Sequence, residues 1–293
     1  MIEVSIIIPA YNEEKNISNV INKIGSCLEE KQIKYEIIVV NDGSTDRTEE
    51  MALKSRYLTT LISHSKNLGY GASIKTGLKT ASYPWIAIID ADGTYPEEEI
   101  YNMIIFAEKH DLDMVVGARI GKDVKIPTIR KPVKFLINKL ANYLTGKKIP
   151  DLNSGLRIIK KNILEKFLYL LPDGFSFTST ITLAMLANNY EIGYYPISYF
   201  KRTGKSKIRP IRDTINFIQL IIRTVMYFEP LKIFIPISLI LFLMAVIAFI
   251  LRQIKGGGFA ITIVILLTTS LHMLAIGMLA DLIDKRLKEK NKN

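Results

Sequence analysis

The sequence WIAIIDADGTYP, residues 85–96, decides the class of fold. It opens with five apolar residues and continues with Asp90 and Asp92, which are separated by one alanine. An almost purely apolar run of this length is typical of a strand that is covered on both faces of a sheet. Similar short runs occur at residues 4–8, 37–40 and 114–116. We therefore expect buried strands at these four places.

Helical patterns alternate with the apolar runs. The positions between the first two runs share one helix face: Ile17, Val20, Ile21, Ile24 and Leu28. Further helical patterns follow Thr45, Tyr70 and Pro96. This alternation predicts an α/β fold with a mostly parallel, Rossmann-like sheet and helices on both faces. Ligands of such sheets bind at the carboxyl ends of the strands.

The composition is that of a folded chain with an anionic partner. The 293 residues are 48% apolar and 23% charged, which excludes a disordered or fibrous protein. One cysteine, Cys27, excludes an intramolecular disulfide and a cysteine-based zinc site. Three scattered histidines, His64, His110 and His272, disfavour a histidine-ligated metal centre. The net charge of +11 leaves nucleic acid, phospholipid and a phosphorylated small molecule open as partners.

Two long apolar segments follow the α/β region. Residues 231–251 contain one charge, Lys232, and residues 259–280 contain none. About 20 helical residues cross a hydrocarbon core, and the link 252–258 is too short for a domain. The pattern predicts a transmembrane helical hairpin. The alternative is two buried helices of a soluble core, which rarely run so far without a charge.

The flanking charges predict the orientation of the hairpin. The first residues include Glu3 and do not resemble a signal peptide. Residues 201–232 carry eight basic and two acidic side chains, and residues 281–293 are also basic, whereas the link has only Arg252 and Lys255. This distribution follows the positive-inside rule, so we expect a protein of the cell membrane with its α/β domain and C-terminus in the cytoplasm.

The expected segments are a cytoplasmic α/β domain (1–208), a juxtamembrane helix (209–230), two membrane spans (231–251 and 259–280) and a basic tail (281–293). The juxtamembrane segment has isoleucines at helical spacing with arginines between them. It is either an amphipathic helix in the lipid headgroup layer or a helix packed on the α/β domain.

Polar residues collect after three of the predicted strands, at residues 9–13, 41–46 and 90–93. In an extended chain Asp90 and Asp92 project to the same side, so their carboxylates reach one point. Mg²⁺ in proteins is typically held by one or two carboxylates together with substrate phosphates. The alternative for this Asp-x-Asp sequence is a solvated acidic turn.

The loop at residues 41–46 has two interpretations. It forms an Asx turn and an N-cap, with Ser44, Thr45 or Asp46 as the capping residue, or it contacts a ligand through Asp42. The chain has no Walker-type lysine loop and no G-x-G-x-x-G sequence, so the common phosphate and dinucleotide cradles are absent.

Four ordered motifs carry a family resemblance: SIIIPAYNEEKNI (5–17), EIIVVNDGSTDRT (36–48), NLGYGASIKTGLKTA (67–81) and WIAIIDADGTYP (85–96). Together they resemble the GT-A-fold glycosyltransferases of family 2, and within these the polyprenyl-phosphate, dolichol-phosphate mannose synthase-like group. The resemblance extends over residues 4–207, and the paired C-terminal spans suit family members that carry their own membrane anchor.

The resemblance implies a set of donor and metal residues. Asp92 would bind the metal, Mg²⁺ or Mn²⁺, as the second residue of the DxD motif, and Asp90 would lie near the donor ribose and sugar. The loop 151–157, DLNSGLR, is expected below the sugar. The donor nucleotide pocket would be lined by Pro9, Tyr11, Glu13, Val40, Asp42, Asp90 and Ala91.

The resemblance also implies a phosphate site and leaves the sugar open. Arg119 and Arg202 would face the phosphates of donor and acceptor, and with Asp90 and Asp92 they form the expected catalytic set. Mannose synthases of this group place a glutamine where this chain has Thr94, and some have a lysine in the stretch occupied here by residues 175–180. These departures do not affect the predicted fold. They leave the donor's sugar and nucleotide base unassigned, so mannose and guanine are not established for this chain.

A lipid phosphate acceptor suits the basic side chains that this sequence places in its loops. A phosphate monoester has a second pKa of about 6 and is already largely anionic at neutral pH, so it needs cationic partners rather than a general base. For each basic residue taken singly, the alternative is a position on a solvent-exposed basic surface. The candidates are Arg119, Arg130, Lys131, Arg202, Lys205 and Lys207, of which Arg119, Arg130, Arg202 and Lys207 form the expected acceptor phosphate site.

These features together predict a membrane-anchored, inverting glycosyltransferase. It would move one sugar from a GDP-mannose, UDP-glucose or UDP-GlcNAc type of donor to a dolichyl or undecaprenyl phosphate. One alternative is a non-catalytic membrane partner subunit with the same fold. A processive polysaccharide synthase is disfavoured because its Q-x-x-R-W motif is missing and the only tryptophan is Trp85. Nucleic acid is disfavoured because much of the positive charge lies beside the membrane segments. A homo-oligomer stays open.

Overall fold

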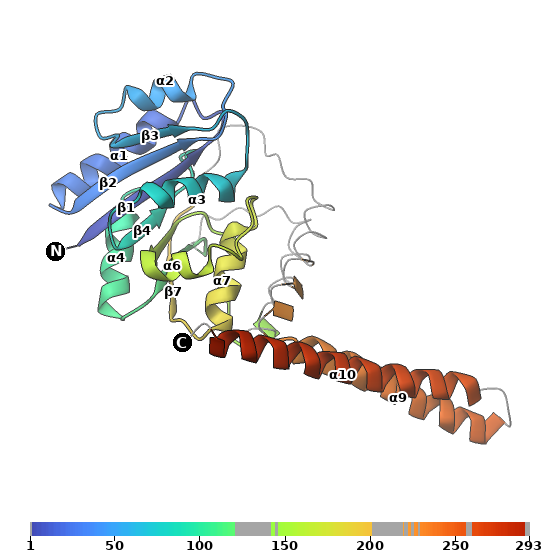
Figure 1. The fold of residues 1–293 in the computed structure, drawn as a ribbon. Helices are drawn as coiled ribbons and strands as arrows, with labels where there is room; N and C mark the ends of the chain where they lie inside the picture. The colour runs from blue at the N-terminus through green and yellow to red at the C-terminus, as the bar shows by residue number, and fades with distance from the viewer. Residues whose placement is uncertain are drawn as a thin grey trace.

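The computed structural model describes residues 2–120, 142–143, 146–200, 219, 222–223, 226–227, 229–255 and 260–290. A seven-stranded sheet of order β3-β2-β1-β4-β6-β5-β7 lies at the centre of the N-terminal part (Figure 1). Its strands are β1 (Glu3–Ala10), β2 (Lys34–Asn41), β3 (Thr60–Ser63), β4 (Trp85–Ile88), β5 (Met114–Ala118), β6 (Arg157–Lys160) and β7 (Ile192–Pro196).

The strand directions confirm the mostly parallel sheet. The strand pairs β1–β2, β1–β4, β2–β3 and β5–β7 are parallel. Only β6 runs antiparallel, and it lies between β4 and β5. All four expected strands are present as β1, β2, β4 and β5, whereas the sequence analysis did not identify β3, β6 and β7.

Helices cover both faces of the sheet, as predicted. They are α1 (Ile17–Glu30), α2 (Thr48–Leu53), α3 (Tyr70–Thr80), α4 (Glu99–Lys109), α6 (Lys161–Phe167) and α7 (Phe177–Ala187). Along β1, Ile6 and Ile8 pack in one core with α1 and α4, and Ile7 packs in the other with α3, α6 and α7. This division follows from the alternation of side chains along a strand. The five apolar residues predicted to share a face of α1 are all buried.

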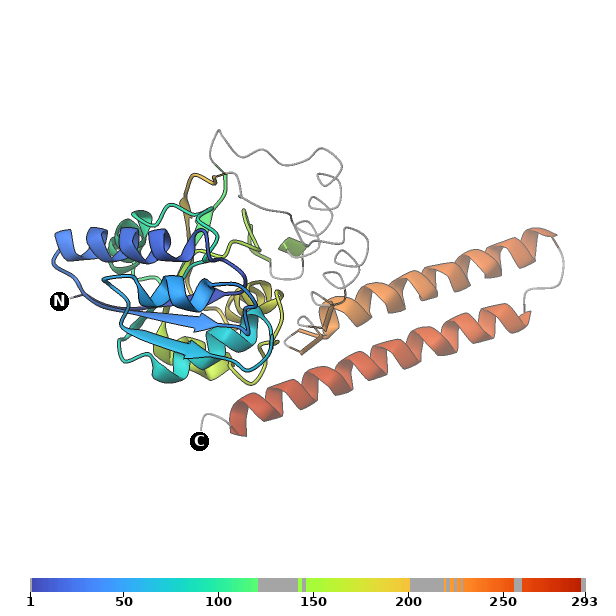
Figure 2. The same cartoon turned by 90° about the horizontal axis from the view of Figure 1, so that it is seen from above.

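The C-terminal residues form two long antiparallel helices that project from the α/β domain, α9 (Leu231–Lys255) and α10 (Ala260–Lys290) (Figures 1 and 2). Both are long and apolar enough to cross a membrane, and only 17% of each apolar window is buried. That low burial disfavours the soluble-core alternative, because core helices are covered by protein. The second helix continues ten residues beyond the expected end at residue 280, and Lys285 and Asp281 form an i,i+4 ion pair of 2.8 Å in that extension.

Small and polar residues fix the register of this hairpin. The hydroxyl of Ser238 donates to the carbonyl of Ser270 over 2.9 Å, and the hydroxyl of Ser270 donates to the carbonyl of Ser238 over the same distance. A Cβ at Gly277 would lie 2.6 Å from Cβ of Phe234, so the two helices approach closely there. Small residues and interhelical hydrogen bonds are the usual means of helix association in lipid.

The base of the hairpin contacts the α/β domain. Ile233 of α9 packs against a cluster formed by Ile149, Leu152, Leu183 and Leu186. Most of the expected juxtamembrane helix, residues 209–230, lies outside the described residues. The few described positions between 219 and 227 are helical and exposed, which does not decide between the two interpretations of that segment.

Candidate functional site

The loops after β1 and β2 are joined by side-chain to backbone hydrogen bonds. The backbone N–H of Asn12 donates to the Ser44 hydroxyl over 3.0 Å, and the N–H of Thr45 donates to Oδ1 of Asn12 over 2.8 Å. The N-cap of α2 is Arg47 and not one of the three predicted residues, although Asp46, one position earlier, accepts the N–H of Thr48, the first residue of α2. The expected donor residues Pro9, Tyr11 and Glu13 are partly exposed beside this junction.

The Asp42 carboxylate is engaged inside the protein. Its Oδ1 accepts the N–H of Leu68 over 2.8 Å, and its Oδ2 accepts the N–H of Gly69 over 2.9 Å. His64 connects two further groups, since its Nδ1 is hydrogen-bonded to Asp42 Oδ1 over 2.8 Å and its Nε2 to the Thr76 hydroxyl over 3.0 Å. Asp42 is only 4% exposed. Asp42 thus braces the turn before α3 in this structure, and its contact with a donor nucleotide stays a prediction.

Val40 lies at the end of strand β2, just before this loop. It has no exposed surface and packs in the core beneath α3, where its Cγ2 lies 3.4 Å from the position of a Cβ on Gly77. The residue is part of strand β2, so its side chain alternates into the core while the polar loop begins after Asn41. Its place in the nucleotide pocket stays a prediction.

Asp90 follows β4 and lies against the loop that precedes β6. A Cβ on Gly155 would lie 2.6 Å from Asp90 Oδ1 and 2.7 Å from Cγ, so only glycine leaves room for this carboxylate. The N–H of Gly155 donates to the buried hydroxyl of Tyr95 over 2.7 Å. Burial, and then the charge of Asp90, raise the pKa of both Tyr95 and Tyr70 above the ordinary tyrosine value. Two neutral phenols thus flank the Asp90 carboxylate.

The Asp92 carboxylate is held by Thr94. The backbone N–H and the hydroxyl of Thr94 donate to Asp92 Oδ1 over 3.2 and 2.6 Å. Thr94 has no exposed surface. Its hydroxyl orients Asp92.

Arg119 directly follows β5 and forms a bidentate ion pair with Asp151. Arg119 Nε and Nη2 donate to Asp151 Oδ2 and Oδ1 over 2.7 and 2.9 Å, and the Arg119 backbone N–H adds a third bond of 3.1 Å. The guanidinium also lies over the Tyr199 ring, 5.2 Å from its centre. Burial alone would lower the pKa of Arg119, but the bonds to Asp151 and the nearby Tyr95 raise it above its ordinary value. Contact between Arg119 and a substrate phosphate stays a prediction.

Arg157 stabilises the loop of residues 151–155 by hydrogen bonds to its backbone. It is completely buried and donates to the carbonyls of Ser154 and Leu152, each over 2.8 Å, and to the Thr182 hydroxyl. Among the described residues no carboxylate pairs directly with it, and burial lowers its pKa. Arg157 is a scaffold for residues 151–155, and Gly155 of this loop lies beside Asp90, whereas the position of the loop below the sugar stays a prediction.

The structure brings together part of the expected site. Asp90, Asp92 and Arg119 share the edge at the carboxyl ends of β4 and β5, connected through Tyr95, Tyr199 and the 151–155 loop. Arg130, Arg202 and Lys207 lie outside the described residues, as do Lys131 and Lys205. The sequence analysis missed Tyr70, Tyr95 and His64. A tyrosine seven residues beyond Ile88, the last residue of β4, was the only sequence signal for Tyr95.

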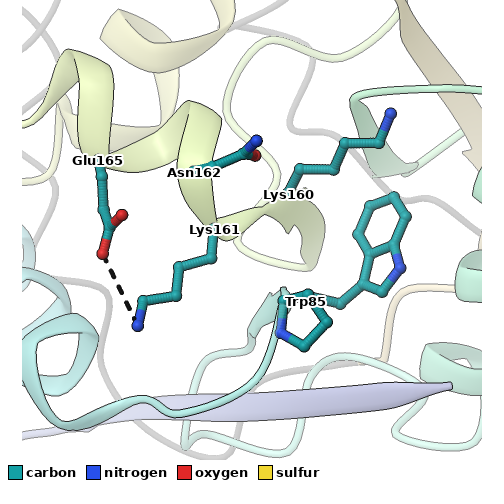
Figure 3. Close-up of a pocket in the computed structure, with 6 residues that line it drawn as sticks. Trp85, Lys160, Lys161, Asn162 and Glu165 are labelled. Carbon is teal, nitrogen blue, oxygen red and sulfur yellow. Dashed lines mark ion pairs between the residues drawn. The ribbon is translucent and has the colours of Figure 1, made fainter.

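One hollow lies away from these residues. A hollow of about 450 Å³ occurs at the opposite end of β4, where Trp85 begins the strand (Figure 3). Its two lysines are already paired, Lys161 with Glu165 at 3.7 Å and Lys160 with Asp113 at 3.0 Å. A smaller hollow of about 250 Å³ is lined by residues 12–16 and Asp46, next to the expected donor residues.

The carboxylates of the DxD motif suit a divalent ion whose remaining ligands come from water and the substrate. No group of three or more histidine, cysteine or acidic side chains gathers within the part of the chain that the structure describes. Mg²⁺ commonly takes one or two protein carboxylates and fills its other positions with water and substrate phosphates. Asp92, oriented by Thr94 at the end of β4, offers such a carboxylate.

Comparisons with known proteins agree with this geometry. The chain is 32% identical over 220 residues to the dolichol-phosphate mannosyltransferase of Pyrococcus furiosus, covering 71% of this chain and 59% of that protein. It is 29% identical over 213 residues to the low-salt glycan biosynthesis hexosyltransferase Agl6 of Haloferax volcanii, covering 71% of this chain and 50% of that one. The chain thus spans about half to three-fifths of these two relatives.

A solved structure has the same fold. Glucosyl-3-phosphoglycerate synthase from Mycobacterium tuberculosis, in complex with Mn²⁺, UDP and phosphoglyceric acid, aligns with a TM-score of 0.60 and 19% identity over 76% of this chain and 78% of that one. Residues 229–285 match the GtrB C-terminal hairpin, and residues 5–168 match glycosyl transferase family 2. The chain therefore belongs to glycosyl transferase family 2, with a GT-A-like α/β domain followed by a GtrB-type helical hairpin.

Proposed function

We propose that this protein transfers one sugar from a nucleotide-diphosphate sugar to the phosphate of a polyprenyl phosphate. The observation that carries the proposal is the position of the 151–155 loop. Gly155 of this loop lies against Asp90, whereas Leu152, three residues earlier, packs with Ile233 in the first turn of α9. The DxD carboxylates therefore lie a few residues from the base of the membrane hairpin, where the phosphate of a membrane lipid is located.

The reaction breaks the bond between the anomeric carbon and the diphosphate oxygen and forms a bond to an oxygen of the lipid phosphate. Because that oxygen is already anionic at neutral pH, no side chain has to remove a proton from it. A divalent ion, when bound, would neutralise the departing nucleotide diphosphate as a Lewis acid. Asp92 would hold that ion and Asp90 would position the donor. The family implies inversion at the anomeric carbon.

Relatives support the two substrate classes. Their names include a dolichyl-phosphate hexose transferase of Haloferax volcanii and a dodecaprenyl-phosphate galacturonate synthase of Rhizobium johnstonii, 27% identical to this chain over 209 and 169 residues. These names differ in the sugar and in the lipid but share a polyprenyl phosphate. We therefore assign the acceptor class and leave the sugar and the nucleotide base unassigned.

The α/β domain and the C-terminus are proposed to lie in the cytoplasm. Both basic flanks belong to the base of the hairpin, and the less basic link at residues 252–258 belongs to its tip. A membrane-impermeant protease added from the cytoplasmic side should leave this link intact. Cleavage of the link from that side would contradict the orientation.

The function is tested with the full chain purified in detergent. It is incubated with polyprenyl phosphate, Mg²⁺ and a panel of labelled UDP- and GDP-sugars, with Asp92→Asn as the control. We expect one donor to label the lipid in the native protein and none to do so in the variant. Absence of labelled lipid with every donor would favour the non-catalytic partner subunit.

A further inference from the structure

The first turn of α9 packs against both α10 and the α/β domain. Phe234 lies so close to α10 that a Cβ at Gly277 would be 2.6 Å from the Phe234 Cβ. The preceding residue, Ile233, packs instead against buried residues of the α/β domain, where the base of the hairpin lies beside α7 (Figure 1). These residues are Ile149, Leu152, Leu183 and Leu186. Successive helical residues point about 100° apart, so one helical turn joins the hairpin to the domain.

Leu152 connects this cluster to the proposed active site. The residue before it, Asp151, forms the bidentate ion pair with Arg119, over 2.7 and 2.9 Å. Three residues after it, Gly155 lies so close to Asp90 that a Cβ would be 2.7 Å from the carboxyl carbon. The loop therefore contacts both of these charged groups within five residues. A displacement of Leu152 would change the positions of Arg119 and Asp90 together.

Helix α7 provides a second connection between the hairpin and the same loop. Leu183 and Leu186 of the cluster belong to this helix. One turn before Leu183, the hydroxyl of Ser179 donates to Oδ1 of Asn153 over 2.9 Å, and Ser179 has no exposed surface. The loop is thus held through its own leucine and through α7, and Ile233 packs on the cluster that contains both.

We propose that Ile233 is a positioning residue for the sugar transfer, through which the membrane hairpin holds residues 151–155 against Asp90. This inference rests on the proposed function, and it gives the hairpin a role in turnover in addition to membrane anchoring. Truncation of Ile233 to alanine removes packing from the cluster, and the surrounding structure partly relaxes into the cavity that remains. A displacement of about 1 Å at an active site lowers the rate by roughly 10²-fold, so a smaller shift of this loop is also measurable.

The kinetic test compares two alanine variants of the full chain purified in detergent. Ile235→Ala is the matched control for Ile233→Ala, because Ile235 lies two residues later on α9 and is 47% exposed. Rates are measured at saturating polyprenyl phosphate, since a hairpin that only captured the lipid would alter KM and not kcat. We expect the kcat of Ile233→Ala to fall about tenfold and that of Ile235→Ala to stay native. Ile233→Leu, which conserves the side-chain volume, should regain most of the rate.

Hydrogen–deuterium exchange separates a positioning role from a general loss of stability. The N–H of Gly155 donates to the Tyr95 hydroxyl over 2.7 Å, so its exchange reports opening of the loop. Ile233→Ala should speed exchange in the peptide that contains residues 151–155 by about tenfold and leave the peptides of β1 and β2 unchanged. Equal acceleration throughout the α/β domain, no acceleration in the loop, or a native kcat for Ile233→Ala would overturn the proposal. Failure of the native chain to transfer sugar would refute the proposed function instead, and the exchange measurement would still decide whether Ile233 holds the loop.

Discussion

Gly155→Ala tests the closest contact in the proposed active site. The added methyl group would lie 2.6 Å from Asp90 Oδ1 and 2.7 Å from Cγ, whereas ordinary contacts begin at 3.4 Å. The carboxylate must therefore shift by about 1 Å. A misplacement of that size in an active site costs roughly 10²-fold in rate. We expect kcat/KM to fall by about that factor.

The effect on stability should be much smaller than the effect on rate. Overpacking at one site costs about 1–3 kcal/mol, and the alanine restricts the unfolded chain, which offsets up to about 1 kcal/mol of that cost. The matched control is Gly174→Ala, because a Cβ there meets no atom within 4 Å and Gly174 has no positive φ. Transfer of labelled sugar and thermal unfolding are measured for both variants. A Gly155→Ala enzyme within threefold of the native rate would refute the assignment of Asp90 to the reacting centre.

The remaining predictions concern the metal and the loop scaffold. Asp92→Asn should abolish turnover without changing the Tm, and EDTA should abolish native turnover until Mg²⁺ or Mn²⁺ is restored. Full activity in EDTA would contradict both. Asp151→Asn leaves Arg119 without its charge partner and should lower the free energy of unfolding by about 3 kcal/mol, measured by denaturant titration. Arg157→Lys loses the planar fork that meets three acceptors, so its Tm should fall; an unchanged Tm would show that the loop does not need Arg157.

The sequence predicted those parts of the fold whose pattern is local. The strands β1, β2, β4 and β5 were found because each is a short apolar run. Strand β6 begins with Arg157, and a charged residue normally indicates exposure, whereas here it is buried under the 151–155 loop. Strands β3 and β7 are only partly buried, so their patterns lack the apolar run.

The sequence predicted that the site lies at the carboxyl ends of the strands, but it did not predict the contacts of each side chain. Asp90 and Asp92 follow a buried strand, as expected, whereas their roles and the position of the 151–157 loop below the sugar stay predictions. Whether Asp42 faces a ligand depends on His64 and residues 68–69, which lie more than twenty positions away in the chain. The same holds for Arg119, whose partner Asp151 is 32 residues away. Such contacts arise only when the whole sheet is assembled.

Identification of the lipid product tests the central claim most directly. The purified full chain is incubated with polyprenyl phosphate and the donor that supports labelling, and the extracted lipid is analysed by mass spectrometry together with the released nucleotide. The account predicts a lipid that carries one sugar and one phosphorus atom, with one nucleoside diphosphate released for each lipid modified. A product with two phosphorus atoms, or nucleotide release that is the same with and without the acceptor, would contradict it.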